Sequence, residues 1–558
     1  MVASIVGESR LSRRARPHPV AYLTLVIAKL WLVDGQRLTA YGSLTIDDQW
    51  FVRRAAAISA GNWLGPFEYR TLIKQPGYPL FIAAVHFTRI PLLLAEHFLY
   101  TAAAGLLIVA LRPLLHSRRR RLIAFALLLF NPMTMNTAIS ARVDRAGVYP
   151  AMVMLLLACL VGLVASSGKP DSFTPAWAAG ASASLGCIWW LREEWLLVLP
   201  AVIVGLLLAI VRVRRWSLPT SRRLAMILVI ALVPVSVVTS SYTLEQLNKS
   251  HYGLAITNVE QTSMSAGIGP MFRVEPVTTI DRYPITAETR VRLYTASPTF
   301  ASLRNQIERN TDQRYFSTRP DGVRDFDGQV FQWVVLDAIG RAGLASTATQ
   351  LDDTFRSIGH EIDATCASKR LRCGAPHDGI APAWQWNRTP SLALRTLRGL
   401  RKTIDLNAFS AISPAGDGTS AERALFADMT NESLAPGPSS ALTRLRVHLV
   451  SALRLLYKLL IGIAIITALT RARAAIRQRR KPSWPMFAAL TLALLVLLAR
   501  TLGLAYLDLT AFPGFSPTYL ATGYAAAVVI VVVVLLGKNP QAILVTEVPT
   551  AAASPTAQ

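Results

Sequence analysis

Several stretches of about 20 residues in this sequence contain almost no charge, whereas the segments between them are densely charged. Only 16% of the 558 residues are charged, against about 25% in a soluble protein of this length. Uncharged stretches this long can cross the hydrocarbon core of a bilayer as helices. The sequence therefore predicts a mainly α protein, a polytopic membrane helical bundle whose first partner is the lipid bilayer.

The charged segments are strongly basic, and the formal net charge is +25. Arginine clusters such as the one at residues 118–121 lie beside apolar stretches, which is typical of cytoplasmic loops that face anionic lipid. The basic excess is therefore interpreted as a determinant of topology, and no nucleic-acid partner is expected. The pattern predicts a multi-pass protein of the bacterial cytoplasmic (inner) membrane with cytoplasmic N- and C-termini.

Hydropathy and the positive-inside rule together predict about ten spans. They cover residues 20–38, 92–113, 121–139, 146–165, 175–191, 194–211, 223–242, 446–470, 484–505 and 517–536. Residues 77–90 are expected to form a short interfacial helix, because a second crossing there would place the arginine cluster outside. The first span resembles a signal peptide, but Lys29 and Asp34 favour an uncleaved helix.

These spans divide the chain into three parts. The N-terminal transmembrane module covers 1–242, an extracytoplasmic domain covers 243–443, and a C-terminal transmembrane module with a cytoplasmic tail covers 444–558. The domain is too long for a structureless loop, and apolar residues recur at helical spacing between 331 and 368, so we expect it to be mostly helical. Within it, Cys366 and Cys373 are the candidate disulfide of an oxidising compartment. No second cysteine pair or histidine cluster accompanies them, so a zinc site is not expected.

A set of charged residues falls in the short outer loops between the expected spans. In chain order they are Asp47, Asp48, Lys74, Arg142, Asp144, Arg145, Arg192, Glu193 and Glu194. Charges so close to the hydrocarbon core are costly, so they are expected to be paired or to bind a ligand. For the turn at 192–194, the sequence favours a closing ion pair and a ligand site about equally. For residues 142–145, it favours charges that flank helix ends and a ligand site about equally. The acidic pair could also be simply solvated.

Taken together, several segments resemble the C-type glycosyltransferase (GT-C) superfamily of polytopic membrane enzymes. The acidic pair lies in the first outer loop, and the segment from it to KQPGYPLF is similar to the superfamily's amphipathic loop helix and the start of its next span. NPMTMNTAISARVDR and WLREEWLLVLP resemble its second outer loop and a later turn, and SPTYLATGYAA is a looser match. The resemblance covers roughly the first 240 residues.

The resemblance implies an enzyme that moves a sugar from a polyprenyl-phosphate donor to an unknown glycan, lipid or protein acceptor on the outer face. Asp47 or Asp48 would be the general base. The candidate partners of the donor phosphate are Lys74, Arg142, Arg145 and Arg192. Glu193 or Glu194 would bind sugar hydroxyls or orient Arg192, and all these groups, with Asp144, should converge on one cavity.

Some members of the superfamily use a divalent cation such as Mg²⁺ or Mn²⁺. Two aspartates alone make a poor metal site, so no metal and no certain cofactor are predicted.

Three alternatives remain open at the level of sequence. A lipid-linked glycan polymerase or ligase would share the topology. A transporter or flippase would place charges near the bilayer midplane on interrupted helices, usually with internal repeats. A non-catalytic membrane scaffold would use its outer domain to bind a partner.

Overall fold

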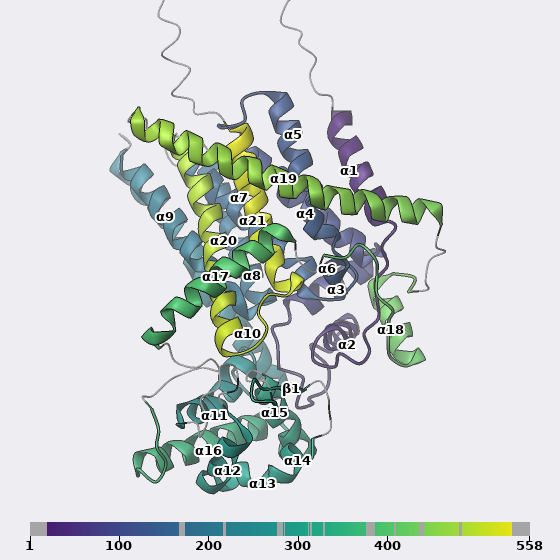
Figure 1. The fold of residues 1–558 in the computed structure, drawn as a ribbon, viewed down its shortest axis with the longest axis vertical. Coiled ribbons are helices and arrows are strands. Elements are labelled where there is room, and N and C mark those ends of the chain that lie inside the picture. Colours follow the sequence, from purple (N-terminus) through teal and green to yellow (C-terminus); the bar gives the residue numbers. More distant parts are fainter. Residues whose placement is uncertain are drawn as a thin grey trace, which may run out of the picture.

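The computed structural model describes residues 19–166, 173–215, 219–275, 283, 285–310, 312, 315–326, 330–374, 385–406, 409–434, 440–478 and 483–537. Helices dominate, and strands β1 (Phe316–Thr318) and β2 (Arg324–Phe326) form an antiparallel pair with Phe316 opposite Phe326. A bundle of long helices stands above a smaller helical domain (Figure 1). The protein is mainly α and polytopic, as the sequence predicts.

Seven helices of the described residues are long and apolar enough to cross a membrane. They are α4 (Leu92–Ala110), α7 (Tyr149–Ser166), α9 (Leu199–Arg214), α10 (Thr220–Tyr252), α19 (Ala441–Arg477), α20 (Trp484–Thr510) and α21 (Pro517–Leu536). Two further predicted spans form helices outside this set. The first, α1 (Pro19–Val33), has only 15 residues. The second, α8 (Phe173–Leu191), has 19 residues but is rich in small side chains.

Residues 121–139 do not form the continuous span that the sequence predicts. Helix α5 (Arg118–Leu129) ends before Asn131-Pro132, and the short helices η1 (Pro132–Met135) and α6 (Thr137–Ser140) follow it. Proline disfavours helical backbone in the residue before it. Asn131 instead caps η1 by accepting the N–H of Met133, so the chain turns here although its hydropathy stays high.

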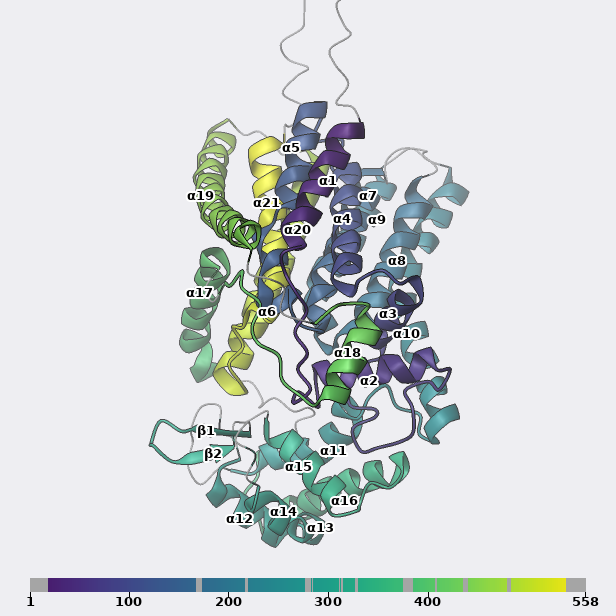
Figure 2. The same ribbon diagram turned by 90° about the vertical axis from the view of Figure 1, so that its right-hand side faces the viewer.

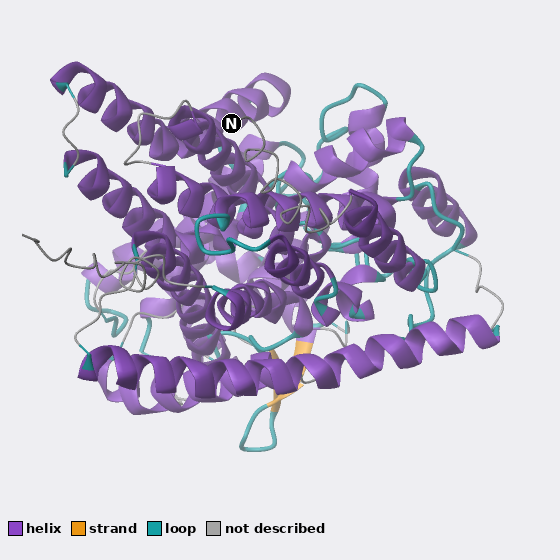
Figure 3. Ribbon diagram, turned by 90° about the horizontal axis from the view of Figure 1, so that it is seen from above, coloured by secondary structure: helices purple, strands orange, loops and turns teal. Residues whose placement is uncertain are grey.

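Helix α19, expected as a span over 446–470, has 37 residues and is therefore roughly 55 Å long. Figure 1 shows it crossing the outside of the bundle obliquely, and from above it runs along one edge (Figure 3). Arg446, near its start, pairs with Asp34 at 2.9 Å and lies over the ring of Trp31. These contacts tie the N-terminal end of α19 to the end of α1.

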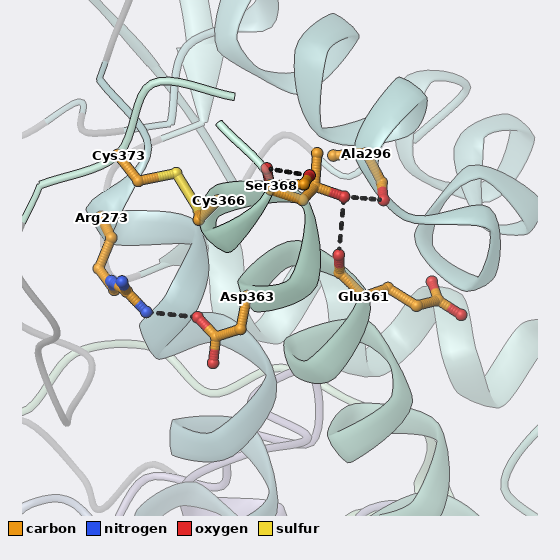
Figure 4. The surroundings of a disulfide bond; sticks show 8 residues. Arg273, Ala296, Glu361, Asp363, Cys366, Ser368 and Cys373 are labelled. Atoms are coloured by element: carbon orange, nitrogen blue, oxygen red, sulfur yellow. Dashed lines mark hydrogen bonds and ion pairs between the residues drawn. A yellow bond between two sulfur atoms is a disulfide. The ribbon is translucent and has the colours of Figure 1, made fainter. Parts of the chain in front are cut away.

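Below the bundle lies what we call the inserted domain, the described residues among 253–374. Its helices are η4 (Glu260–Met264), α11 (Ser265–Ile268), η5 (Gly269–Arg273), α12 (Ala287–Ala296), α13 (Pro298–Ser302), α14 (Arg304–Glu308), α15 (Val330–Arg341) and α16 (Ala348–Ala367). The apolar residues at helical spacing on α15 and α16 are buried, Phe331 and Phe355 among them. Cys366, at the end of α16, forms a disulfide with Cys373, and Arg273 pairs with Asp363 beside it (Figure 4).

The structure divides residues 243–443 more finely than the sequence predicts. Helix α10 continues unbroken to Tyr252. After the inserted domain and the short helix η7 (Trp386–Arg388), α17 (Thr389–Asp405) packs against α20, and α18 (Ser420–Thr430) packs against α2 (Asp48–Ser59) and α3 (Gly77–Thr88). The second half of this stretch therefore lies along the bundle rather than in the domain (Figure 2).

Two features of the arrangement position the site. Helices α2 and α3 lie at the end of the bundle that faces the inserted domain (Figure 2). The start of α1 and the end of α21 lie at the opposite end (Figure 1). The termini predicted to be cytoplasmic, residues 1–18 and 538–558, lie outside the described residues.

Candidate functional site

A cavity of about 770 Å³ lies between the bundle and the inserted domain. Its walls come from the loops before α2 and α3, the turns after α6 and α8, and parts of η4, α15, α20 and α21. Eight charged residues singled out from the sequence line it: Asp47, Lys74, Arg142, Asp144, Arg145, Arg192, Glu193 and Glu194. Short loops thus bring together side chains up to 147 positions apart in the sequence.

The two aspartates of the acidic pair have opposite surroundings. Asp48 is the first residue of α2 and is 0% exposed, and both its oxygens contact the guanidinium of Arg142, with Nε at 3.2 Å. Asp47 precedes the helix, its side chain is 36% exposed, and it pairs with Lys74. Of the pair, only Asp47 is among the residues that line the cavity.

Electrostatics separates the two carboxyls further. Burial alone would raise the pKa of Asp47, but Lys74 and two nearby arginines outweigh it and lower the pKa to about 2. Burial raises the pKa of Asp48 to about 7 against the opposing effect of Arg142. Asp47 is therefore the ionised carboxylate of the pair that faces the cavity at neutral pH.

The turn at 142–145 is built by a cap and an ion pair. The carboxylate of Asp144 accepts the backbone N–H of Ala146 at 2.8 Å and so caps the short helix η2 (Arg145–Gly147). Arg145 Nη1 donates to Glu193 Oε2 at 2.6 Å, which joins this turn to the next one. Arg145 Nε is buried and has no hydrogen-bond partner among the described residues.

The turn at 192–194 holds a sandwiched arginine. The guanidinium carbon of Arg192 lies 5.4 Å from the ring centroid of Tyr149 and 5.2 Å from that of Tyr519. Glu194 contacts Arg192 Nε at 3.3 Å and Arg500 Nη1 at 2.8 Å. Arg192 Nη1 is buried and has no hydrogen-bond partner within the part of the chain that the structure describes. This turn therefore contains ion pairs and still presents a free donor.

Gly77 explains how the loop that carries Lys74 reaches the turn of Arg192. A Cβ atom added at Gly77 would lie 3.0 Å from the backbone N of Leu191 and closer still to the carbonyl of Trp190. Real Cβ atoms do not approach a backbone that closely, so only glycine permits this packing. The start of α3 therefore presses directly against the end of α8.

The inserted domain supplies residues that the sequence analysis did not identify. Glu260 and Gln261 on η4 and Trp333 on α15 line the cavity. Burial raises the pKa of Glu260 to about 7; Glu193 adds to this effect, and Lys74 and Arg145 oppose it. No local pattern marks these residues, because only the closure of the domain onto the bundle brings them to the cavity. Arg500, by contrast, interrupts the apolar run at residues 484–505 of α20, and a charge within a predicted span indicates a functional or paired residue.

Among the described residues, no group of three or more His, Cys, Asp or Glu side chains is arranged to hold a metal ion. The carboxylates of Asp47, Asp48, Glu193 and Glu194 instead pair with Lys or Arg side chains.

Comparison with known proteins gives two structural matches. No protein-family model and no curated protein matches the chain. The structure of ArnT from Cupriavidus metallidurans in the apo state is similar, with a TM-score of 0.32 and 14% identity over 93% of this chain and 78% of that one. The structure of the same protein bound to undecaprenyl phosphate has a TM-score of 0.28 and 11% identity over 91% and 77%. These TM-scores are too low to argue from, so the function is inferred from the cavity and the sequence.

Proposed function

We propose that this chain is a GT-C-type membrane glycosyltransferase that moves a sugar from a polyprenyl-phosphate donor to an acceptor on the outer face of the bacterial cytoplasmic membrane. The observation that carries the proposal is a single cavity at one end of the bundle, lined by an ionised aspartate and cationic side chains from separate loops. The sequence resemblance in the same loops points to the same chemistry. If the cavity lies at the outer face, as proposed, the inserted domain is extracytoplasmic and both termini are cytoplasmic.

The donor phosphate would be bound by the cations of the cavity. Arg145 Nε and Arg192 Nη1 are buried donors without a partner among the described residues, and a buried donor left unpaired costs about 1–3 kcal/mol. A phosphate oxygen at either position would remove that cost. Lys74 and Arg142 line the same cavity and add positive charge, and guanidinium groups suit bidentate contact with phosphate.

The remaining wall of the cavity fits a lipid donor. Its apolar residues lie on η3 (Glu193–Val198), on α20 and in the loop before α21: Leu196, Leu197, Leu507 and Phe512. A polyprenyl phosphate carries its charge at headgroup level and its chain in hydrocarbon. A cavity lined by both charged and apolar residues matches both parts.

Asp47 is proposed as the general base. The acceptor oxygen forms a bond to the anomeric carbon, and the acceptor proton passes to Asp47. The bond between that carbon and the phosphate oxygen breaks, and polyprenyl phosphate leaves with its electron pair. When no polyprenyl-phosphate sugar is bound, Lys74 holds the pKa of Asp47 low. A bound phosphate that draws Lys74 away would raise the pKa of Asp47 and make it a better base.

The test measures donor consumption by the purified protein in liposomes, using a panel of radiolabelled polyprenyl-phosphate sugars. We expect one donor to be consumed and the Asp47→Asn variant to lose about 10²–10⁴-fold in rate, the range for general-base catalysis. Asp353→Asn, an exposed aspartate on α16, is the matched control and should retain the wild-type rate. If none of the polyprenyl-phosphate sugars is consumed, the proposed activity is wrong. If Asp47→Asn keeps full turnover, the role of Asp47 as general base is wrong.

A further inference from the structure

The wall of the cavity that comes from the inserted domain has no role in the donor chemistry described so far. It contains Glu260 and Gln261 on η4 and Trp333 on α15, and it adjoins the loop that carries Lys74. η4 is a π-helical turn, a rare conformation that occurs frequently at functional sites. A carboxyl group, an amide and an indole therefore come from this domain to a cavity whose remaining lining is charged and apolar.

This wall is fixed directly to the bundle. The backbone N–H of Val259 donates to the carbonyl of Leu72 at 2.7 Å, and Gln75 Nε2 donates to Gln261 Oε1 at 3.5 Å. Both bonds end in the segment that carries Lys74. The position of Glu260 is thus tied to the position of the proposed phosphate-binding lysine.

The side chain of Glu260 is also held in place. Gln332 Nε2 donates to Glu260 Oε1 at 3.0 Å, and Gln332 is buried on α15 next to Trp333. Because Gln332 is neutral, this bond orients the carboxyl group without neutralising it. Asp47, by contrast, is paired with a lysine.

We propose that Glu260, Gln261 and Trp333 form the acceptor subsite, and that the acceptor is a saccharide. A pyranose ring has an apolar face that matches an indole and hydroxyl groups at its edge that match a carboxyl and an amide. Glu260 would hold an acceptor hydroxyl while Asp47 removes the proton from the reacting one. This inference rests on the proposed function and adds the class of acceptor to it.

The pKa of Glu260, near 7, supports this role. A group that is partly protonated at neutral pH can accept a hydrogen bond from a hydroxyl or donate one to it. The carboxylate of Asp47, with its pKa near 2, can only accept. Asp47 and Glu260, which both line the cavity, therefore offer different hydrogen-bonding abilities to the two substrates.

The test uses octyl glycosides of a hexose, an aminohexose and a pentose as acceptor probes, with the polyprenyl-phosphate sugar that the protein consumes. We expect wild type to glycosylate at least one probe. Glu260→Gln and Trp333→Ala should each raise the KM for that probe at least tenfold and leave the KM for the donor within about twofold. Trp333→Phe, which keeps an aromatic face, should recover most of the affinity, which a purely structural defect would not.

Glu275→Gln is the matched control, since Glu275 is an exposed carboxylate of the same domain outside the cavity. It should leave both KM values unchanged. An unchanged probe KM in Glu260→Gln, or a parallel rise in the donor KM, would overturn the acceptor subsite. Donor hydrolysis without transfer to any glycoside would overturn the saccharide acceptor while the proposed function stands, whereas no consumption of any donor would refute the proposed function itself.

Discussion

Two buried clusters of arginines and carboxylates, one in the inserted domain and one at the cavity, differ in one respect. In the inserted domain, Arg290 contacts Asp325 and Glu308, each at 2.8 Å, and Arg319 contacts Asp325 at 3.2 Å and Asp321 at 2.7 Å. None of these residues is among those with a buried unpartnered side-chain nitrogen or oxygen in the described chain. At the cavity, Arg145 and Arg192 are equally buried and also paired, yet each retains such an atom.

This difference shows that neither burial nor ion pairing identifies a binding site. Both clusters have buried guanidinium groups and short contacts to carboxylates. Only the cluster at the cavity combines donors left over after pairing with a space that a ligand can fill. The domain cluster is therefore structural, and the cavity cluster is a candidate site.

The largest effect on stability is expected from the removal of a structural arginine. Arg290→Ala leaves Asp325 buried with part of its compensating charge removed, and breaking a buried pair in this way costs about 3–5 kcal/mol. Thermal unfolding of the detergent-solubilised protein should show a much lower Tm. A variant with wild-type Tm would mean that the domain cluster does not contribute to stability.

Arg192→Ala should have the opposite profile. The loss of a guanidinium group with a free donor should weaken binding of polyprenyl phosphate about 10–100-fold, because a charge-assisted hydrogen bond contributes about 1.5–3 kcal/mol. Its Tm should fall less than that of Arg290→Ala. Equilibrium binding of polyprenyl phosphate in detergent measures the effect, and unaltered affinity would remove the distinction between the clusters.

Glu260 gives a pH-dependent prediction. The folded pKa, near 7, lies above the ordinary value of 4.5, so the folded state binds the proton more tightly and loses stability as pH rises from about 4.5 to 7. Glu260→Gln removes this loss and should stabilise the protein by about 1–3 kcal/mol at pH 8, with little effect at pH 4.5. Tm of the wild type and the variant, measured from pH 4.5 to pH 8, checks this prediction. A higher Tm of the variant only at low pH would contradict it.

An exposed ion pair provides the smallest effect. Lys458 contacts Asp405 at 2.7 Å, but the carboxylate is 52% exposed and neither residue lines the cavity. Such pairs contribute about 0–1 kcal/mol. Lys458→Ala should therefore change Tm slightly and leave the affinity for polyprenyl phosphate unchanged. A large change in Tm or in this affinity would show that a short contact distance alone predicts a large contribution.

How much of this molecule the sequence predicts depends on the range of the interaction. Hydropathy and helical spacing predicted the membrane class and helices such as α16, because these patterns are local. The break at Asn131-Pro132 was missed because the apolar composition continues through it, although proline was a local signal that hydropathy does not measure.

The candidate site follows the same division. Charges at span boundaries could be selected one by one, since each is costly where it stands. Their pairing could not: nothing in the sequence shows that Asp48 faces Arg142 while Asp47 faces Lys74. The wall that carries Glu260 depends on how a domain inserted after α10 folds back onto the bundle, which no local pattern encodes.

The length of α10 has a consequence for the height of the cavity. Its 33 residues make it roughly 50 Å long, whereas a hydrocarbon core of about 30 Å requires about 20 residues. The excess turns reach the inserted domain, where Asn248 donates to the carbonyl of Ile256 at 2.8 Å, and Asn248 also accepts from the indole of Trp63, in the loop after α2, at 3.2 Å. The length of helix α10 therefore sets the distance between the bundle and the inserted domain. One residue added to the last turns of α10 would shift the inserted domain by about 1.5 Å along the helix axis and rotate it by about 100°. Glu260 would then move out of register with Lys74.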